Sequence, residues 1–220
     1  MKKPSAVLTI LIVNIVLFVM QIISKSVDFP LTEMLWLDSA KVIFQPWIIV
    51  TSMFLHGSFE HILFNMFVLL MFGSLIEQRI GTKRFYMIYF ASGILAAIAF
   101  VVTPFGNYAV GASGAIMGIL GVTIMLLPHL QVLFFFFIPM SMRTAGIIIA
   151  MVDILGVLGV GPGGFANISH LAGLACGLGY GYYLKSQKQK VMQPEVRKKR
   201  TKRTEMNDDD IEAYLRYGRL

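Results

Sequence analysis

The chain has 220 residues, of which 56% are hydrophobic and 14% are charged, and its mean hydropathy is +0.72. Soluble domains carry about 25% charged residues. Between Arg84 and Lys185 the only formally charged side chains are Arg143 and Asp153. A stretch of that length without charge is incompatible with the surface of a water-soluble globule, so the composition predicts an integral membrane protein.

Six apolar stretches approach the length of a transmembrane helix. A hydrocarbon core of about 30 Å needs roughly 17–25 apolar residues in a helix. The predicted spans are residues 6–23, 59–76, 85–102, 113–127, 144–160 and 168–184, of which the fourth is short. Residues 132–139 are too few to cross alone, and we expect an interfacial or partly buried connector there. The predicted fold class is all-α, a polytopic six-transmembrane-helix bundle over residues 1–185, followed by a tail over 186–220.

Lysine and arginine are distributed unequally along these spans. With six crossings both ends lie on one side, which then carries nine of these residues near the membrane, against Lys25 and Lys41 on the other. Cytoplasmic loops are enriched in Lys and Arg, so both termini are predicted to be cytoplasmic, in a cell membrane. The first span lacks an A-x-A-like cleavage site and is expected to be a retained helix rather than a signal peptide.

The loop between the first two spans, residues 24–58, is then external and long for a small bundle. It carries Trp36 and Trp47 among many other apolar residues. Indole rings favour the membrane interface, so this loop is expected to lie there.

Four polar residues on three predicted spans fall at a similar depth. Ser113 begins the fourth span, His170 lies about one turn into the sixth, and His61 and Asn65 lie near the external end of the second. At 1.5 Å rise per residue, all four are expected in the outer third of the bilayer. Polar groups are costly inside a membrane, which makes each a candidate functional residue.

Ser113 and His170 are the candidate catalytic pair. An unactivated hydroxyl is a poor nucleophile and needs an adjacent base. Glycines recur every three or four residues after both side chains, and small residues let membrane helices approach closely enough for a direct hydrogen bond. The alternative is that both glycine runs only pack helices, with Ser113 as one more small residue.

His61 and Asn65 are spaced i, i+4 and share one helix face. A side-chain amide there can donate a hydrogen bond to the oxyanion of a tetrahedral intermediate, and the Ser113 N–H at a helix start is a second natural donor. The alternative is a packed polar patch below the loop. A zinc peptidase is excluded because Glu60-His61 does not belong to an H-E-x-x-H motif. The single cysteine, Cys176, likewise excludes a disulfide framework and a cysteine zinc site.

Three ordered segments carry a family resemblance: His61-Ile62-Leu63-Phe64-Asn65, Gly111-Ala112-Ser113-Gly114 and His170-Leu171-Ala172-Gly173. Together they resemble the signature of the rhomboid family of intramembrane serine proteases over roughly residues 5–185. Glu77 and Arg79, following Gly73, are similar to that family's G-x-x-x-E-x-R element.

The resemblance implies a fold, a site and a reaction. The fold would be the six-helix rhomboid core, with the first loop embedded in the outer leaflet. Ser113 and His170 would be the catalytic dyad, and Asn65, His61 and the Ser113 N–H would bind the oxyanion, with Gly111 in the same oxyanion and substrate-binding set. Substrates would be single-span membrane proteins cut near the outer face, with small residues preferred at the cut and no metal or organic cofactor.

Two positions depart from the family pattern. An aromatic residue often follows the nucleophile by one turn, and here that position is Met117. The common Arg after Pro-Trp in the first loop is Ile48. Neither change removes a reacting group, although both are expected to lower activity.

Three other ionisable residues are set aside. His56, in the loop before the second span, and His129, after Pro128, are interpreted as interfacial. Asp153 is expected near the external interface because Gly156 and Gly159 suggest an early end to the fifth span. The family works with a dyad, so we expect Asp153→Asn to cost less than tenfold in turnover, mostly through packing or altered opening of the fifth span. The alternative is that Asp153 is the third member of a Ser-His-Asp triad, in which case the loss would exceed about a thousandfold.

The tail explains most of the net charge of +7. Residues 185–220 hold eleven Lys/Arg against six Asp/Glu, a net +5, so the basicity gives no reason to expect nucleic acid. The basic part, 185–203, suits anionic lipid headgroups. Residues 204–220 have an acidic start and i, i+3, i+4 apolar spacing, which fits a short amphipathic helix.

Two functions of other classes compete with proteolysis. A catalytically silent relative would bind transmembrane helices, but such proteins usually lack the Ser or the His. A transporter or channel would need charged residues along a pathway, for which one Asp153 is thin support.

Overall fold

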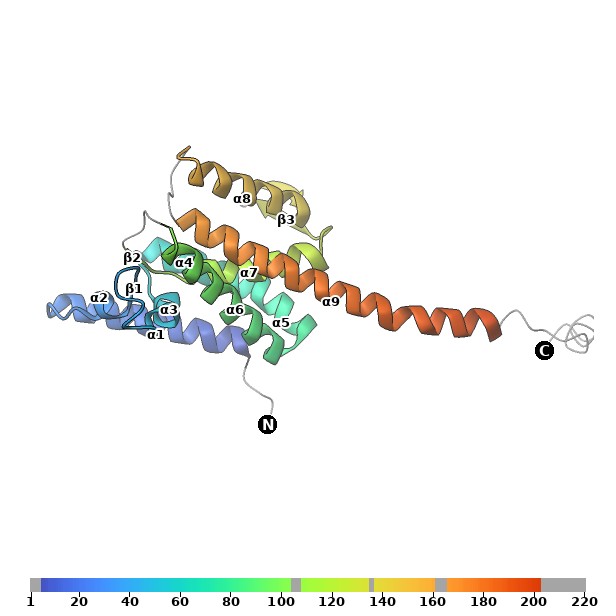
Figure 1. Cartoon of the computed structure of the whole chain (residues 1–220), viewed down its shortest axis with the longest axis horizontal. Helices are drawn as coiled ribbons and strands as arrows, with labels where there is room; N and C mark the ends of the chain where they lie inside the picture. Colours follow the sequence, from blue (N-terminus) through green and yellow to red (C-terminus); the bar gives the residue numbers. More distant parts are fainter. Residues whose placement is uncertain (1–4, 104–107, 135–136, 161–165, 203–220) are drawn as a thin grey trace, which may run out of the picture. The chain divides into compact units, whose positions relative to one another are not determined.

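The structure is a computed structural model that describes residues 5–103, 108–134, 137–160 and 166–202 (Figure 1). Its contacts divide the chain into two units, Met1–Tyr182 and Tyr183–Leu220. The first unit contains the helices that bear the predicted site. The second contains the end of the last helix, while the amphipathic helix predicted over 204–220 lies outside the described residues.

All six predicted spans are helical. They correspond to α1 (Ala6–Ser26), the run of α4 (Phe59–Val68), the π-helical turn η2 (Leu69–Gly73) and α5 (Ser74–Ile80), then α6 (Thr82–Val101), α7 (Ser113–Leu126), α8 (Met142–Val157) and α9 (Ala166–Lys202). The last helix continues beyond 184 through a segment rich in Lys, Gln and Arg, which are good helix formers, although it also contains Pro194.

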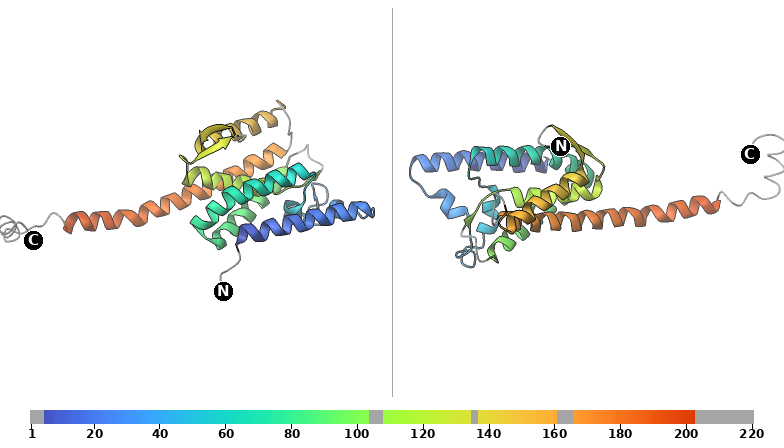
Figure 2. Two further views of the ribbon diagram at one scale, coloured as in Figure 1. Left: turned by 180° about the vertical axis from the view of Figure 1, so that it is seen from behind. Right: turned by 90° about the horizontal axis from the view of Figure 1, so that it is seen from above.

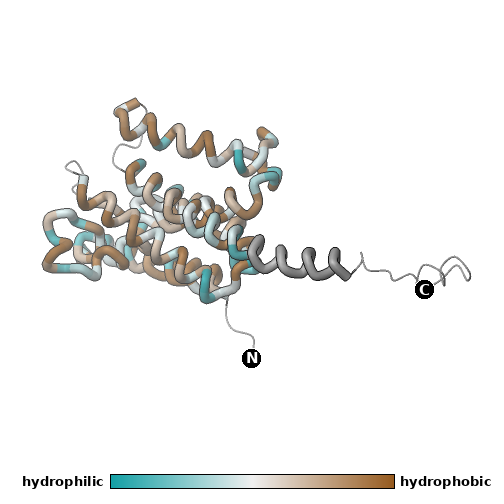
Figure 3. The backbone as a smooth tube through the Cα atoms, turned by 45° about the vertical axis from the view of Figure 1, so that its right-hand side comes forward, coloured by the Kyte–Doolittle hydropathy of each residue, from teal (hydrophilic) through white to brown (hydrophobic). Residues whose placement is uncertain are grey.

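The helices have the composition expected in a membrane. In the part of the chain that the structure describes, the stretches Ala6–Ser26, Phe59–Ile80 and Thr82–Val101 are long and apolar enough to cross, and the apolar α7 is shorter. Hydrophobic residues cover most of these helices in Figure 3. A mainly helical membrane bundle is therefore confirmed, while six as the number of crossings stays a prediction.

Side-chain caps define several helix starts. Ser58 accepts a hydrogen bond from the His61 N–H at 3.2 Å and begins α4, and Ser141 does the same for α8 through the Thr144 N–H. At α1 the Glu77 carboxylate, from α5, accepts hydrogen bonds from the Ala6 and Val7 N–H groups at 2.7 and 3.1 Å. This carboxylate therefore ties the start of α1 to the end of the second predicted span.

The connector at residues 132–139 is a β-hairpin, which the all-α prediction did not contain. β3 (Gln131–Phe134) pairs antiparallel with β4 (Ile138–Ser141), with Gln131 opposite Ser141. β-Branched and aromatic residues favour an extended backbone, and the run is too short for a stable helix. The hairpin packs on α8, as the two views of Figure 2 show.

The first loop is folded back onto the bundle. It contains α2 (Leu31–Leu35), β1 (Leu37–Asp38), α3 (Ile48–Thr51) and the 3₁₀ turn η1 (Ser52–Phe54). β1 pairs antiparallel with β2 (Tyr108–Ala109), and the Trp36 ring stacks on Tyr108 with centroids 4.4 Å apart. The loop therefore holds the segment that leads into Ser113.

Ile48 has a structural role where the family pattern often has an arginine. Its side chain is 1% exposed and forms a buried cluster with Leu37, Ala97 and Phe100. The substitution places an apolar anchor between α3 and α6, where a charged side chain would be costly.

The helix α7 lies in the interior of the first unit, with ten consecutive residues from Gly114 to Thr123 buried. On one side Gly114 packs against Ala96 of α6. On the other, a Cβ at Gly173 or Gly177 of α9 would collide with the carbonyl oxygen of Gly114 or Gly118. The predicted close approach of these two glycine-bearing helices is confirmed, and it brings their polar ends together.

Candidate active site

Ser113 and His170 are joined by a hydrogen bond. Ser113 is the first residue of α7, and His170 is the fifth residue of α9. The Ser113 Oγ and the His170 Nε2 are 2.9 Å apart. Both side chains are half-buried, so the pair is enclosed by helices and still accessible. The contact expected from their matched depth and from the glycine spacing is present.

Asp153 lies on the other side of the imidazole, as in the triad alternative rather than in the preferred interpretation of the sequence. Its Oδ1 is 3.1 Å from the His170 Nδ1, and the residue is only 5% exposed. The expected position near the end of the fifth span is correct, because α8 ends four residues later at Val157. Proximity to the external interface stays a prediction, while the side chain itself is buried because α8 packs this face against α9.

Gly111 brings His61 beside the nucleophile. Its φ of +135° is a backbone conformation that residues with a side chain rarely adopt. A Cβ there would lie 2.9 Å from the His61 Nε2 and 3.7 Å from the Ser113 Oγ, and the Gly111 N–H donates to the Ser52 carbonyl at 2.9 Å. The absence of a side chain at this position lets the His61 ring approach the turn before α7.

Asn65 lies one helical turn after His61 on α4, which packs against α7. The side chain is 8% exposed, and its Nδ2 has no hydrogen-bond partner among the described residues. Buried donors normally have a partner, so an orphaned amide on the α4 face that also carries His61 is a donor available to a bound group. The first N–H groups of α7, including that of Ser113, are likewise not used within the helix.

His56 is more deeply buried than an interfacial residue, at 2% exposed, and its ring meets that of His61 edge-on with centroids 5.0 Å apart. Burial, and secondarily the neighbouring His61, lowers the pKa of His56 from 6.5 to about 3, so its imidazole is neutral. His129 is exposed and lies in the turn between α7 and β3.

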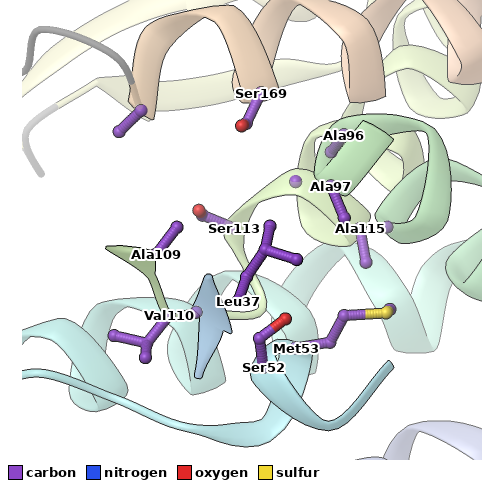
Figure 4. Close-up of a pocket in the computed structure, with 14 residues that line it drawn as sticks. Leu37, Ser52, Met53, Ala96, Ala97, Ala109, Val110, Ser113, Ala115 and Ser169 are labelled. Atoms are coloured by element: carbon purple, nitrogen blue, oxygen red, sulfur yellow. The ribbon is translucent and has the colours of Figure 1, made fainter. Parts of the chain in front are cut away.

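A small cavity of about 60 Å³ adjoins the nucleophile. Its walls come from α6, α7, α9 and the first loop, and most lining side chains are alanine, glycine or serine. Figure 4 shows Ser113 at one side with Leu37 beside it, and Ala96, Ala97 and Ala115 across the space. The volume accommodates a side chain of one or two carbon atoms.

No group of three or more His, Cys, Asp or Glu side chains in the described ranges is arranged to hold a metal ion. The side chains that hydrogen bonds and helix packing bring toward the site are the Ser113 hydroxyl, the imidazoles of His170 and His61, the Asp153 carboxylate and the Asn65 amide.

Comparison with known proteins relates the chain to one family. A family model described as "Rhomboid domain" matches residues 44–187. RHOMBOID-like protein 4 of Arabidopsis thaliana is 31% identical over 151 residues, covering 67% of this chain and 37% of that protein. Rhomboid protease GluP of Bacillus subtilis is 33% identical over 133 residues, covering 60% of this chain and 24% of that protein.

A third relative, Rhomboid-like protease 1 of Toxoplasma gondii, is 30% identical over 145 residues, covering 62% of this chain and 46% of that protein. The chain thus spans less than half the length of each of these relatives. The family model nevertheless covers more than half of this chain and includes Asn65, Ser113 and His170. With its apolar helices, the chain is an integral membrane protein that belongs to the rhomboid family.

Proposed function

We propose that this chain is an intramembrane serine endopeptidase in which Ser113 is the nucleophile and His170 the general base. The observation that carries the proposal is the 2.9 Å hydrogen bond between the Ser113 Oγ and the His170 Nε2, made by residues of two apolar helices. The names of two relatives, a rhomboid protease and a rhomboid-like protease, support the same reaction class.

The first half of the reaction follows from this hydrogen bond. The Ser113 hydroxyl donates its proton to the His170 Nε2 as the Oγ attacks the carbonyl carbon of the scissile peptide bond. The protonated imidazole then gives the proton to the leaving amine, and the C–N bond breaks. The product is an ester between Ser113 and the N-terminal part of the substrate.

The oxyanion formed in this attack needs donors that are already in place. The proposed donors are the Asn65 Nδ2, the His61 ring and the Ser113 N–H at the start of α7. Preorganised donors in a site with little water act without the cost of reorienting solvent. Gly111 contributes indirectly, since any side chain there would displace the His61 ring.

Hydrolysis of the ester repeats the sequence with water as the nucleophile. His170 takes a proton from the water molecule, and the resulting tetrahedral intermediate expels the Ser113 oxygen, which regains its proton from the imidazole. Every covalent step uses side chains or backbone of this chain, so the proposal names no metal or organic cofactor.

The proposed substrates are membrane proteins with one transmembrane helix, cut in or near the outer part of the bilayer. The lysine and arginine distribution supports cleavage in the outer part, because it predicts that both termini are cytoplasmic and that Ser113 lies at the external start of its span. The membrane is proposed to be a cell membrane. The cavity of about 60 Å³ beside Ser113 supports a preference for a small residue, such as alanine, before the cut. The basic tail is proposed to bind anionic lipid headgroups.

A fluorophosphonate probe tests the proposal directly. It should label the purified wild-type protein in detergent or lipid, and Ser113→Ala should abolish the label. Ser92→Ala is the matched control, because Ser92 is a fully buried serine of α6 that packs against Gly118 rather than His170. Its labelling should match wild type.

Cleavage of a single-span model substrate completes the test. The wild type should release two fragments, and Ser113→Ala should release none. Turnover by purified Ser113→Ala, or equal labelling of that variant and wild type, would mean that the nucleophile is not Ser113.

A further inference from the structure

We infer that Asp153 is a positioning residue for this reaction: its carboxylate holds the His170 imidazole in the orientation and tautomer that accept the Ser113 proton. The inference rests on the proposed function for its catalytic consequence. Its structural part stands on the contact between the Asp153 Oδ1 and the His170 Nδ1, which is independent of any activity.

The two hydrogen bonds of His170 are chemically linked. A neutral imidazole carries one N–H, so one ring nitrogen donates and the other accepts. An ionised carboxylate can only accept, which fixes the proton on Nδ1 and leaves the Nε2 lone pair directed at the Ser113 hydroxyl. With the proton on Nε2 instead, His170 would donate to the Ser113 Oγ and could not act as its base.

The placement of Asp153 is difficult to explain by packing. The residue lies on the face of α8 that meets α9, one turn before Gly156, whose missing Cβ accommodates the amide of Asn167. An apolar side chain would fill this position without a desolvation cost. The carboxylate instead makes its hydrogen bond to His170, and its Oδ2 has no partner among the described residues. A buried acid with this one contact is typical of a functional position.

The charges around the imidazole give the carboxylate a second effect. His170 is faced by Asp153 from α8 and by His61 from α4, with the buried His56 behind His61. The helix α7 contributes the Ser113 hydroxyl and has no ionisable side chain. Asp153 is therefore the negative group that stabilises the imidazolium formed when Ser113 loses its proton.

These two effects define the expected behaviour of variants. Removing the corresponding carboxylate from a Ser-His-Asp arrangement typically costs about 10⁴ in turnover. We expect Asp153→Asn and Asp153→Ala to lose at least about a hundredfold in kcat/KM, within the range of general-base catalysis. Asn should be at least as impaired as Ala, because its amide can donate to Nδ1 and stabilise the wrong tautomer. The preferred interpretation of the sequence expects a loss of less than tenfold, so this measurement decides between the two expectations.

A pH profile separates positioning from packing. Without the carboxylate the imidazolium is less stable, so the acidic limb of the kcat/KM profile should move to lower pH in both variants. Asn167→Ala is the matched control, since it removes a buried polar side chain from the same interface. Its acidic limb should stay at the wild-type position, and the melting temperature of each variant shows whether it is folded.

Nitrogen-15 spectra of the histidine rings test the tautomer without any turnover. In alkaline solution the wild-type His170, identified by its loss in His170→Gln, should show a protonated Nδ1 and an unprotonated Nε2. Asp153→Ala should shift the proton toward Nε2. Unchanged shifts in Asp153→Ala, or kcat/KM within tenfold of wild type and an unmoved acidic limb in both variants, would overturn the inference. An inactive, unlabelled wild type with the expected tautomer change would instead refute the proposed function alone.

Discussion

Replacing Asn65 by alanine should separate activity from stability. The side chain is 8% exposed on α4, and its Nδ2 has no hydrogen-bond partner among the described residues. In the resting protein this unpaired donor lowers the stability of the fold, and in the tetrahedral intermediate it donates a hydrogen bond to the oxyanion. The variant should therefore lose rate without losing the fold.

Both magnitudes follow from this difference. A buried donor without a partner costs about 1–3 kcal/mol, which removing Asn65 relieves and which offsets the packing lost on truncation. The free energy of unfolding should change by no more than about 1 kcal/mol. Losing one oxyanion donor typically lowers turnover by about 10²–10³. Labelling of Ser113 by a fluorophosphonate should continue, although more slowly.

Thr123→Ala provides a control with the opposite pattern. Thr123 is fully buried on α7, and its Oγ1 donates to the Ile119 carbonyl at 2.8 Å. Losing a satisfied hydrogen bond should lower stability by about 1 kcal/mol and leave kcat/KM unchanged. The assay measures kcat/KM on a single-span substrate together with the melting temperature, for both variants in the same detergent.

Two results would refute the reasoning about Asn65. Turnover within threefold of wild type would mean that the oxyanion is held by other donors. A melting temperature that falls as far as that of Thr123→Ala, with the rate loss explained by unfolded protein, would make Asn65 a packing residue.

Three further predictions concern the pair, the α1 cap and pH. Ser113→Ala and His170→Ala should each abolish turnover, and the double variant should be no worse. Additive losses in single-turnover assays would contradict the proposal that the two residues act as one catalytic unit. Glu77→Gln should lower the free energy of unfolding by about 2 kcal/mol, because an amide cannot replace both acceptor oxygens of the carboxylate. An unchanged melting temperature would mean that the Glu77 carboxylate does not stabilise the start of α1. The pKa of His56 is lowered from 6.5 to about 3, so between pH 6.5 and about 3 the imidazole of His56 is protonated in the unfolded chain and neutral in the folded protein. Stability should thus fall as pH drops below 6.5, by up to about 1.4 kcal/mol per unit. His56→Gln should flatten this dependence in melting experiments and His129→Gln should not; identical slopes would contradict it.

Much of this architecture could be predicted from the sequence because it depends on local composition. Apolar runs of sufficient length predict membrane helices, and each of the six predicted runs is helical. The pairing of Ser113 with His170 followed from depth and from the glycine runs, since glycine is what permits the backbone contact of Gly173 with Gly114. Depth along a span and the spacing of glycines can each be read from a single segment of the sequence.

The features that sequence reasoning missed depend on contacts between distant segments. The β3–β4 hairpin was expected only as a connector, because a short apolar run indicates neither strand nor helix by periodicity. The pairing of β1 with β2 joins residues about seventy positions apart and has no local signature. Two signals for Asp153 were available: it is the single acidic residue between Arg84 and Lys185, and Gly156, one turn away, permits α8 to approach α9 closely.

Two of the buried polar atoms that lack partners among the described residues belong to the proposed machinery. They are the Asn65 Nδ2 and the Asp153 Oδ2, whereas others lie on residues that the mechanism does not use, such as Asn14, Tyr89 and Ser92. An unpaired buried polar atom costs free energy in the folded protein. At Asn65 and Asp153 this cost is expected if the site is organised for charges that appear only during reaction, an oxyanion at Asn65 and an imidazolium beside Asp153.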